Sequence, residues 1–450
     1  EAIKNRLSEQ TNITYAKGCH THKYLPKIEE SLMGNKQGFL VEYFEGSTFD
    51  KNLLVSEYLV GNKFWVFEGF AKDVIAKLER PDISVRFSCD YIPNITGDHE
   101  FEIFGIGKAR LLINGNEIID NWTETSPGEA FFSFSSESRK DKVNLKKDET
   151  YKIEIQYKFE GNFPAIYIGC QTPDKVNLFE EAINAANDAD QVILIVGTNS
   201  DWETEGNDRS DFNLPMNQNH LIEEILKVNS NTIIVLNTGS PIRMPWADKA
   251  STILQTWFAG QEFGNALTDI LTGVINPSGK LPTSFPKELE DTPAFEYYPG
   301  DDLQMNYDER RLVGYKWYER KNIKPLFSFG HGLSYTQFKY SNLNVNVNAD
   351  NKVICSFFIQ NIGDVIGSET MQCYVSYIEE DLSEPLKTLQ GFQKNELEAG
   401  QKNQIEISLS SRNFATWNVN TKDWQVRPGV YEISIGSSAE DILLKANISL

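Results

Sequence analysis

The chain changes its hydrophobic pattern twice along its length. Between residues 38 and 170, apolar and polar side chains alternate between Gly, Asn and Asp turn signals, as in GFLVEYF, ISVRFSCDYI and YKIEIQYKF. A period of two is typical of strands that bury one face. We therefore predict an all-β sandwich or barrel here. The alternation returns from residue 334 to the end, where it predicts a second, smaller antiparallel sandwich.

The middle region, residues 174–333, has a different pattern. Apolar residues recur at helical spacing after a Pro173-Asp174 start signal, and again around Leu221, Ile225 and Val228. Continuous apolar strands, QVILIVGT, TIIVLNTG and STILQTWFAG, separate the helical stretches, and a helix over 262–271 follows the last of them. Such alternation predicts an α/β domain with a mostly parallel sheet covered on both faces.

The first segment, NITYAKGCH, resembles a single strand that precedes the β region. A lone strand cannot bury its faces, so we predict that it belongs to the α/β sheet. The β domain would then be an insertion, which a host domain tolerates when the insert's ends lie close together. The predicted organisation is a first α/β part at 1–35, an inserted β domain at 36–173, the remaining α/β part at 174–333 and a final β domain at 334–450.

Composition narrows the classes of partner. The formal net charge is −21, and a nucleic-acid binder needs clustered Lys and Arg, so we expect no nucleic-acid partner and no anionic membrane surface. No run approaches the roughly 20 apolar residues of a membrane helix. Compartment and homo-oligomerisation are left open.

The cysteine and histidine pattern predicts no metal site. The five Cys residues form no CxxC pair, and a sparse odd count argues against a disulfide framework. Cys19, His20 and His22 lie together in C-H-T-H. A zinc site normally needs a second ligand pair, so an ordinary turn is the favoured interpretation.

Two loops carry most of the candidate chemistry. In α/β sheets, ligands bind beyond the carboxyl ends of the strands. One acidic loop, NSDWETEGNDRSDFNLP, follows the strand that ends at Gly197, and another, rich in aromatic residues, runs from Phe295 to Arg320. Acids interleaved with aromatic rings suit sugars, although solvated loops in an acidic protein would have a similar composition.

Several motifs resemble the C-terminal half of family 3 glycoside hydrolases. They are ETEGNDRSDFNLP, NTGSPIRMPW, NPSGKLPTSFP, GYKWY and FSFGHGLSYTQF. Near the C-terminus, FFIQNIGDVIGSET and RPGVYEISIGSS are similar to that family's fibronectin type III-like domain. In the inserted region, GFLVEYFEG and RLLINGNEIIDNW resemble a PA14 domain, as in the yeast-type β-glucosidases of the family.

The resemblance implies a retaining exo-acting enzyme that removes terminal β-D-glucosyl residues from small β-glucosides or oligosaccharides, with no cofactor. It places the nucleophilic Asp on an N-terminal barrel domain, so we expect this chain alone to be inactive. Within NYDERRLVGYKWYE it places the general acid/base at Glu309. Tyr307, Asp308 and Tyr315 are the expected neighbours that would favour its protonated form. The family's usual Gly beside the acid is missing here.

Weaker site predictions concern four other residues. Asp208 and Arg209 are either part of the active-site mouth or an ion pair that fixes a turn. Phe159 or Phe163, in the inserted domain, would stack on a second sugar or else belong to the core. A calcium-dependent lectin would need an Asp-Asp pair, which residues 38–170 lack. The alternative function is a non-catalytic carbohydrate-binding or scaffold fragment.

Overall fold

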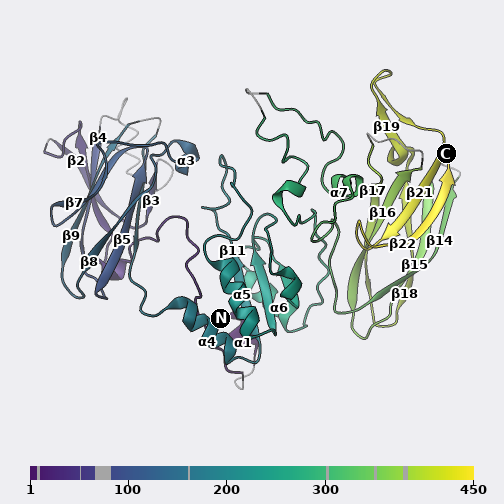
Figure 1. The fold of residues 1–450 in the computed structure, drawn as a ribbon, viewed down its shortest axis with the longest axis horizontal. Coiled ribbons are helices and arrows are strands. Elements are labelled where there is room, and N and C mark those ends of the chain that lie inside the picture. The colour runs from purple at the N-terminus through teal and green to yellow at the C-terminus, as the bar shows by residue number, and fades with distance from the viewer. Residues whose placement is uncertain are drawn as a thin grey trace. The chain divides into compact units, whose positions relative to one another are not determined.

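The computed structural model describes residues 1–7, 11–50, 52–65, 83–160, 163–300, 304–348, 352–378 and 384–450 (Figure 1). The chain forms two compact units. The first unit comprises Glu1–Thr14, Asp211–Leu214 and Ile234–Leu450, and the second comprises Tyr15–Ser210 and Pro215–Ile233. Within the described residues, none of the helices has the length and hydropathy needed to span a membrane.

The inserted β region of the second unit consists of two antiparallel sheets. Their strand orders are β2-β1-β4-β9-β6-β7 and β3-β10-β5-β8. The strands are β1 (Phe39–Glu45), β2 (Leu53–Leu59), β3 (Lys63–Trp65), β4 (Ile83–Tyr91), β5 (Gly97–Gly105), β6 (Gly107–Ile113), β7 (Asn116–Asn121), β8 (Arg139–Leu145), β9 (Tyr151–Phe159) and β10 (Ala165–Gln171). Two short helices, η1 (Glu30–Leu32) and α3 (Ala130–Ser133), accompany them.

Alternating burial along these strands produces one shared core. In β9 every second residue is buried, and Ile153, Ile155 and Tyr157 are fully enclosed. Side chains from both sheets join them in a single hydrophobic cluster. Asn114 and Gly115 both have positive φ, which gives the two-residue turn that the hairpin between β6 and β7 requires. The predicted all-β region is confirmed as two sheets, whereas its likeness to a PA14 domain stays a prediction.

The two ends of this β region lie side by side. The amide of Cys170, near the end of β10, donates to the carbonyl of Pro26 at 2.8 Å. A Cβ on Gly169 would lie 2.6 Å from the carbonyl oxygen of Leu25, so only glycine allows the two segments to approach this closely. The chain therefore enters and leaves the sandwich at one place.

The α/β region contains a three-stranded sheet with the order β11-β12-β13. Helix α5 lies between β11 and β12 in the sequence. The elements are α1 (Ala2–Arg6), α4 (Leu178–Asn187), β11 (Val192–Gly197), α5 (Gln218–Val228), β12 (Thr232–Asn237), η2 (Ala247–Lys249), β13 (Thr252–Gln255), α6 (Phe263–Leu271), η3 (Leu289–Asp291) and α7 (Tyr315–Lys321). The predicted alternation of strands and helices is confirmed.

Two details of the predicted helices differ from the structure. Helix α4 begins at Leu178 because the side chain of Asn177 accepts hydrogen bonds from the amides of Phe179 and Glu180, so the predicted Pro173-Asp174 start is wrong. Helix α5 buries Leu221 and Ile225 as predicted, but Val228, at its last turn, is 40% exposed.

The prediction of a strand in NITYAKGCH is wrong. Residues 12–20 form no strand, and only Gly18 among them is buried. Gly18 has a φ of +80°, which interrupts an extended run, and a Cβ there would lie 2.5 Å from the Leu221 side chain of α5. The segment therefore packs against a helix at one close approach instead of pairing with a sheet.

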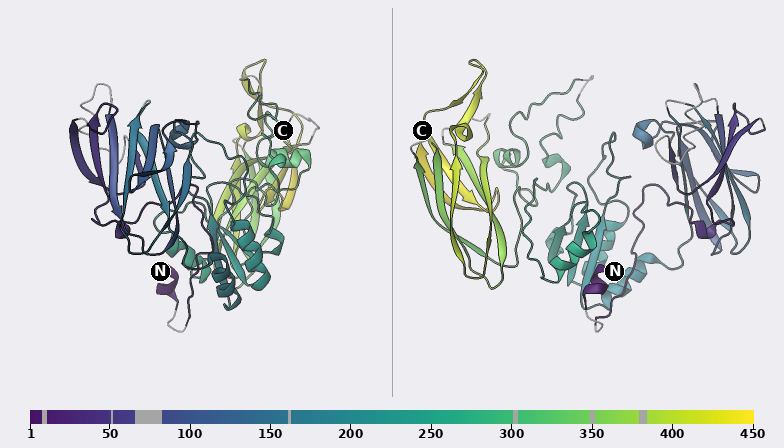
Figure 2. Two further views of the ribbon diagram at one scale, coloured as in Figure 1. Left: turned by 60° about the vertical axis from the view of Figure 1, so that its left-hand side comes forward. Right: turned by 180° about the vertical axis from the view of Figure 1, so that it is seen from behind.

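The C-terminal region of the first unit is a second antiparallel sandwich, which Figure 2 shows from two further sides in green to yellow. One sheet has the order β14-β15-β18 and the other β17-β16-β21-β22, with β19-β20 as a separate hairpin. Residues of both sheets share one core, which confirms the predicted small sandwich. The elements are β14 (Phe338–Val347), β15 (Val353–Asn361), β16 (Gly367–Tyr377), β17 (Thr388–Leu397), β18 (Lys402–Leu409), η4 (Ser411–Phe414), β19 (Ala415–Asn418), β20 (Asp423–Val426), β21 (Val430–Gly436) and β22 (Ile442–Ser449).

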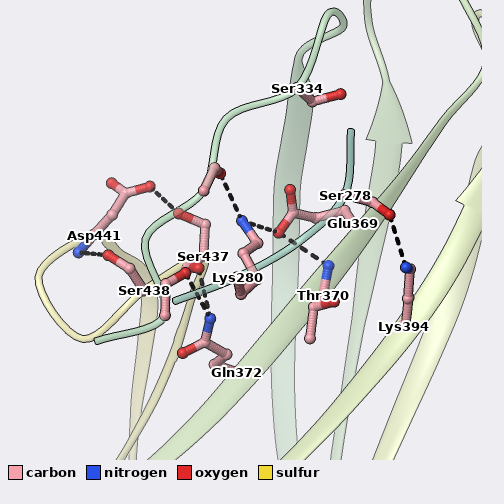
Figure 3. Close-up of polar contacts among 12 residues, drawn as sticks. Ser278, Lys280, Ser334, Glu369, Thr370, Gln372, Lys394, Ser437, Ser438 and Asp441 are labelled. Carbon is pink, nitrogen blue, oxygen red and sulfur yellow. Dashed lines mark hydrogen bonds and ion pairs between the residues drawn. The ribbon is translucent and has the colours of Figure 1, made fainter. Parts of the chain in front are cut away.

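A buried ion pair attaches the segment after α6 to this sandwich (Figure 3). Lys280 Nζ lies 2.9 Å from Glu369 Oε1 on β16, and the two side chains are only 12% and 8% exposed. The same ammonium group donates to the carbonyl of Gly332 at 3.0 Å. Beside it, Lys394 on β17 donates to the Ser278 hydroxyl at 2.7 Å. Charged and polar contacts thus join this segment to the sandwich.

Candidate active-site loops

Glu309, the predicted acid/base, lies in a turn that precedes α7. The amide of Leu312 donates to the Glu309 carbonyl at 2.9 Å, and the next residue, Arg310, has a φ of +51°. The Glu309 side chain is half-buried. Its Oε2 atom is enclosed and accepts no hydrogen bond from any residue that the structure describes. Buried carboxylate oxygens normally accept a hydrogen bond, so the missing donor needs an explanation.

The three expected neighbours of Glu309 differ in their exposure and contacts. Tyr307 is 69% exposed, and Asp308 is also exposed. The Tyr315 ring stacks on Phe329 with centroids 4.9 Å apart, and its hydroxyl accepts from the Leu389 amide at 2.8 Å. Burial raises the pKa of Tyr315 to about 12. Tyr315 therefore joins α7 to β17, and its hydroxyl accepts a backbone hydrogen bond there.

The second acidic loop, residues 198–210, follows β11 and is anchored within its own unit. The indole of Trp202 donates to the carbonyl of Thr21 at 2.7 Å. The amide side chain of Asn207 donates to the carbonyl of Glu129, and its oxygen accepts from the Ser133 hydroxyl at 2.7 Å. Hydrogen bonds between Asn207 and the inserted β region thus anchor this loop.

The carboxylates of the 198–210 loop have distinct surroundings. Glu203 accepts from the Thr198 hydroxyl and lies 3.9 Å from the guanidinium of Arg209. Burial raises the pKa of Asp201, while Lys63 and Lys23 lower it. Glu205 is exposed. The carboxylates of this loop therefore differ: Glu203 lies near a guanidinium, Asp201 is half-buried, and Glu205 and Asp208 are exposed.

Arg209 and Asp208, predicted as a pair, do not share a described contact. Arg209 lies near Glu203, as given above, and Asp208 is exposed and makes contacts of its own. The turn-fixing ion pair between Asp208 and Arg209 therefore stays a prediction.

The two predicted phenylalanines lie in different surroundings. Phe159 is 8% exposed and belongs to the core of the inserted sandwich, which supports the core interpretation and leaves little ring surface for a sugar. Phe163 is partly buried, and its ring meets that of Phe134 edge-on with centroids 6.0 Å apart.

Sequence reasoning missed a group of aromatic and basic residues near the 198–210 loop. Lys63 Nζ lies 4.8 Å from the ring centroid of Trp65 and 5.4 Å from that of Phe131. Lys23 lies 5.7 Å from the ring centroids of Tyr24 and Trp202. The segments that contribute them are far apart in sequence, and the runs KFWVF and EAFFSF gave only separate local aromatic signals.

Across the described ranges, no cluster of three or more His, Cys, Asp or Glu side chains could hold a metal ion. In the C-H-T-H segment, His20 Nε2 lies 2.8 Å from Asp174 Oδ2, and Lys17 Nζ lies 3.1 Å from His20 Nδ1. Both ring nitrogens of His20 therefore already contact protein side chains.

Comparison with known proteins gives the same assignment over most of the chain. Residues 3–335 match the glycosyl hydrolase family 3 C-terminal domain, and residues 369–439 match the fibronectin type III-like domain. A beta-glucosidase of Rhizobium radiobacter is 32% identical over 463 residues, which cover 100% of this chain and 55% of the relative.

Solved structures agree with this match. The crystal structure of a beta-glucosidase from Kluyveromyces marxianus in complex with glucose has a TM-score of 0.88 at 30% identity and covers 100% of this chain and 55% of that chain. DesR, a beta-glucosidase from Streptomyces venezuelae in complex with D-glucose, has a TM-score of 0.67 at 26% identity and covers 100% of this chain and 52% of that chain. The chain spans about half the length of the relatives it matches. It belongs to glycosyl hydrolase family 3, of which it carries the C-terminal domain, followed by a fibronectin type III-like domain.

Proposed function

We propose that this chain is the C-terminal part of a retaining β-glucosidase that removes terminal β-D-glucosyl residues. The observation that carries the proposal is the match of the whole chain to a beta-glucosidase crystallised with glucose. The nucleophilic Asp would lie on an N-terminal barrel domain, which fits the 55% coverage of the relatives. The chain alone should then be inactive.

The proposed reaction uses two carboxyl groups in two steps. One attacks the sugar as nucleophile while the other protonates the leaving oxygen, and the groups lie about 5–5.5 Å apart in retaining enzymes. The proton donor then removes a proton from the water that releases the sugar. This chain would supply the second group.

Glu309 is the proposed proton donor. Its enclosed Oε2 atom, without a donor among the described residues, supports a role beyond structure. The buried carboxylate of Glu369 is different, because it lies in an ion pair with Lys280. The weaker predictions, substrate contacts by Asp308, Asp208, Arg209 and Phe163, belong to the same proposal.

The loop that follows β11 offers a competing donor. Ligands of α/β sheets bind beyond the carboxyl ends of strands, and this loop occupies that place. Its exposed carboxylates are Glu205 and Asp208, and since Asp208 makes contacts of its own, Glu205 is the residue to test. The test of the proton donor therefore has to include both Glu309 and Glu205.

The test compares Glu309→Ala with Glu205→Ala in the protein extended by its N-terminal barrel. We expect Glu309→Ala to lower kcat/KM on a glucose disaccharide by about 10²–10⁴-fold, because the leaving alkoxide then lacks a proton donor. The loss should be much smaller on a dinitrophenyl glucoside, whose leaving group needs little protonation. Added azide should restore turnover of that substrate by replacing the activated water.

The two variants separate the possible outcomes. Equal losses on both substrates for Glu309→Ala would remove its acid/base role. If only Glu205→Ala shows a large loss on the disaccharide and a small loss on the dinitrophenyl glucoside, the proton donor is Glu205, in the loop after β11. An unaltered barrel-bearing protein that binds glucosides without hydrolysing them would favour the alternative, a carbohydrate-binding fragment.

A further inference from the structure

Two of the five free cysteines lie in the core of the C-terminal sandwich, one on each of its two sheets. Cys355 is on β15 and Cys373 is on β16, and both side chains are fully buried. Every second residue of β15 is buried, which turns Cys355 inward together with Val353 and Phe357. Cys373 belongs to the same hydrophobic cluster. Both thiols therefore lie in the space between the two sheets.

The strand neighbours of the two cysteines meet across this core. Cys355 pairs with Ile407 on β18, and Cys373 pairs with Gly391 on β17. A Cβ on Gly391 would lie 2.7 Å from the Ile407 side chain and 4.0 Å from the Cβ of Cys373. The row of residues that contains Cys373 therefore faces the row that contains Cys355, and the absence of a side chain at Gly391 lets the two rows approach closely.

The two thiol groups contact each other directly. A hydrogen bond between them raises the pKa of Cys373, burial raises it further, and the same hydrogen bond lowers the pKa of Cys355. Cys373 is therefore the donor and the Cys355 sulfur the acceptor. In the inserted sandwich, by comparison, the Cys170 sulfur lies 3.9 Å from the hydroxyl oxygen of Tyr91. A disulfide requires Cβ atoms only about 3.5–4.5 Å apart, so thiols that touch across a core need little movement to form one.

We propose that Cys355 and Cys373 form a disulfide bond that joins the two sheets of the C-terminal sandwich when the chain folds in the presence of oxidised glutathione. One cysteine thiolate attacks the glutathione disulfide, forms a mixed disulfide and releases one glutathione thiolate. The second cysteine then attacks the cysteine sulfur of the mixed disulfide and releases the other glutathione. The two cysteines thus lose two electrons and two protons, and the oxidant gains them as two glutathione thiols.

Burial decides when this bond can form and break. Glutathione cannot reach a fully enclosed thiol, so the first exchange takes place in the unfolded or opened sandwich. Folding then brings Cys355 and Cys373 together and encloses the bond. A cross-link of this kind restricts the unfolded chain and thereby stabilises the folded one. The bond uses none of the proposed catalytic groups, so it is independent of the proposed function.

Refolding of the 450-residue chain tests the proposal. Chain refolded from urea with reduced and oxidised glutathione is compared with chain refolded with dithiothreitol. In the glutathione sample, we expect two fewer thiols to react with iodoacetamide under denaturing conditions. Its melting temperature should also be higher by at least about 4 °C.

Peptide mapping identifies the linked residues. Trypsin should release residues 353–387 as one peptide that contains both cysteines, because no Lys or Arg lies between its ends. This peptide should be lighter by two hydrogen atoms than the reduced peptide. Further cleavage after Glu369, which lies between the two cysteines, should leave the halves joined until a reductant is added.

Variants separate this bond from general cysteine oxidation. Cys373→Ala should abolish both the loss of thiols and the gain in melting temperature, whereas Cys89→Ala should keep both. Cys89 is the matched control because it is also buried in a strand, β4, but belongs to the core of the inserted sandwich. Each variant is compared with its own dithiothreitol sample, which removes the effect of the substitution itself on stability. Five reactive thiols in the glutathione sample of the parent chain, or a link that joins other cysteines in place of these two, overturns the proposal.

Discussion

Individual buried carboxylates show how this chain separates structural from candidate catalytic acids. Glu102 is fully enclosed, yet it accepts hydrogen bonds from the Leu25 amide and the Ser138 hydroxyl and lies 3.5 Å from Lys140. Burial raises the pKa of Glu102, and these partners lower it. Satisfying a buried acid with several donors is the usual structural solution. The enclosed Oε2 atom of Glu309 has no hydrogen-bond donor among the described residues.

His22 gives a prediction about acid stability. Burial lowers its pKa to about 4, with further lowering from His20, Lys17 and Lys140 and an opposing effect of Asp174. In the unfolded chain the pKa is near 6.5, so between about pH 6.5 and 4 the unfolded state binds a proton that the folded state does not. The free energy of unfolding attributable to His22 should therefore fall as the pH drops through this window, and it should not change above it.

Urea unfolding at pH 7.5 and pH 5 measures this effect. His22→Gln should lose less stability than the parent between these two pH values, because glutamine does not titrate. His220→Gln is the matched control, since the His220 side chain is 61% exposed on α5. Identical pH sensitivity of the parent and His22→Gln would contradict the prediction.

At the level of elements, the Lys280–Glu369 pair gives a second prediction. Both side chains are nearly enclosed, and Glu369 also accepts from the Thr370 amide at 3.0 Å. Removing one partner leaves a buried charge unpaired, which typically costs about 3–5 kcal/mol. Glu369→Gln should therefore destabilise the C-terminal sandwich strongly.

A double-mutant cycle checks this pair. Lys280→Met combined with Glu369→Leu should be less destabilising than the sum of the single variants, because no unpaired charge remains. Chemical denaturation of the four proteins provides the four free energies of unfolding. Additive effects would show that the two groups do not interact in solution.

Local pattern predicted the elements better than it predicted their packing. Alternation identified β4 and β9 because their period of two follows directly from which face is buried. The strand predicted in NITYAKGCH is absent because Gly18 packs against Leu221, which lies 203 residues later in the chain. The contacts of Tyr315 with Phe329 and Leu389 were not predicted for the same reason. Long-range contacts of this kind leave no periodic signal.

For the whole molecule, separate cores predict separate unfolding. The inserted sandwich has its own cluster, which contains Phe87, and the C-terminal sandwich has another, which contains Phe357. These clusters lie in different compact units. Calorimetry should therefore show more than one transition.

Substitutions in each core assign the transitions. Phe87→Ala and Phe357→Ala remove nearly fully buried rings, at a typical cost of about 3–5 kcal/mol. Each should lower the temperature of one transition and leave the other nearly unchanged. A single transition that both substitutions shift equally would show that the two cores unfold as one.

The close approach of Leu25 and Pro26 to Gly169 and Cys170 has a practical consequence for engineering. Excising the intervening sandwich leaves two cut ends that are already neighbours, so a linker of a few residues can rejoin them without stretching the backbone. The host domain can therefore be produced in a shortened version, and the effect of the removed part on glucoside hydrolysis can be measured in the protein extended by its proposed N-terminal barrel.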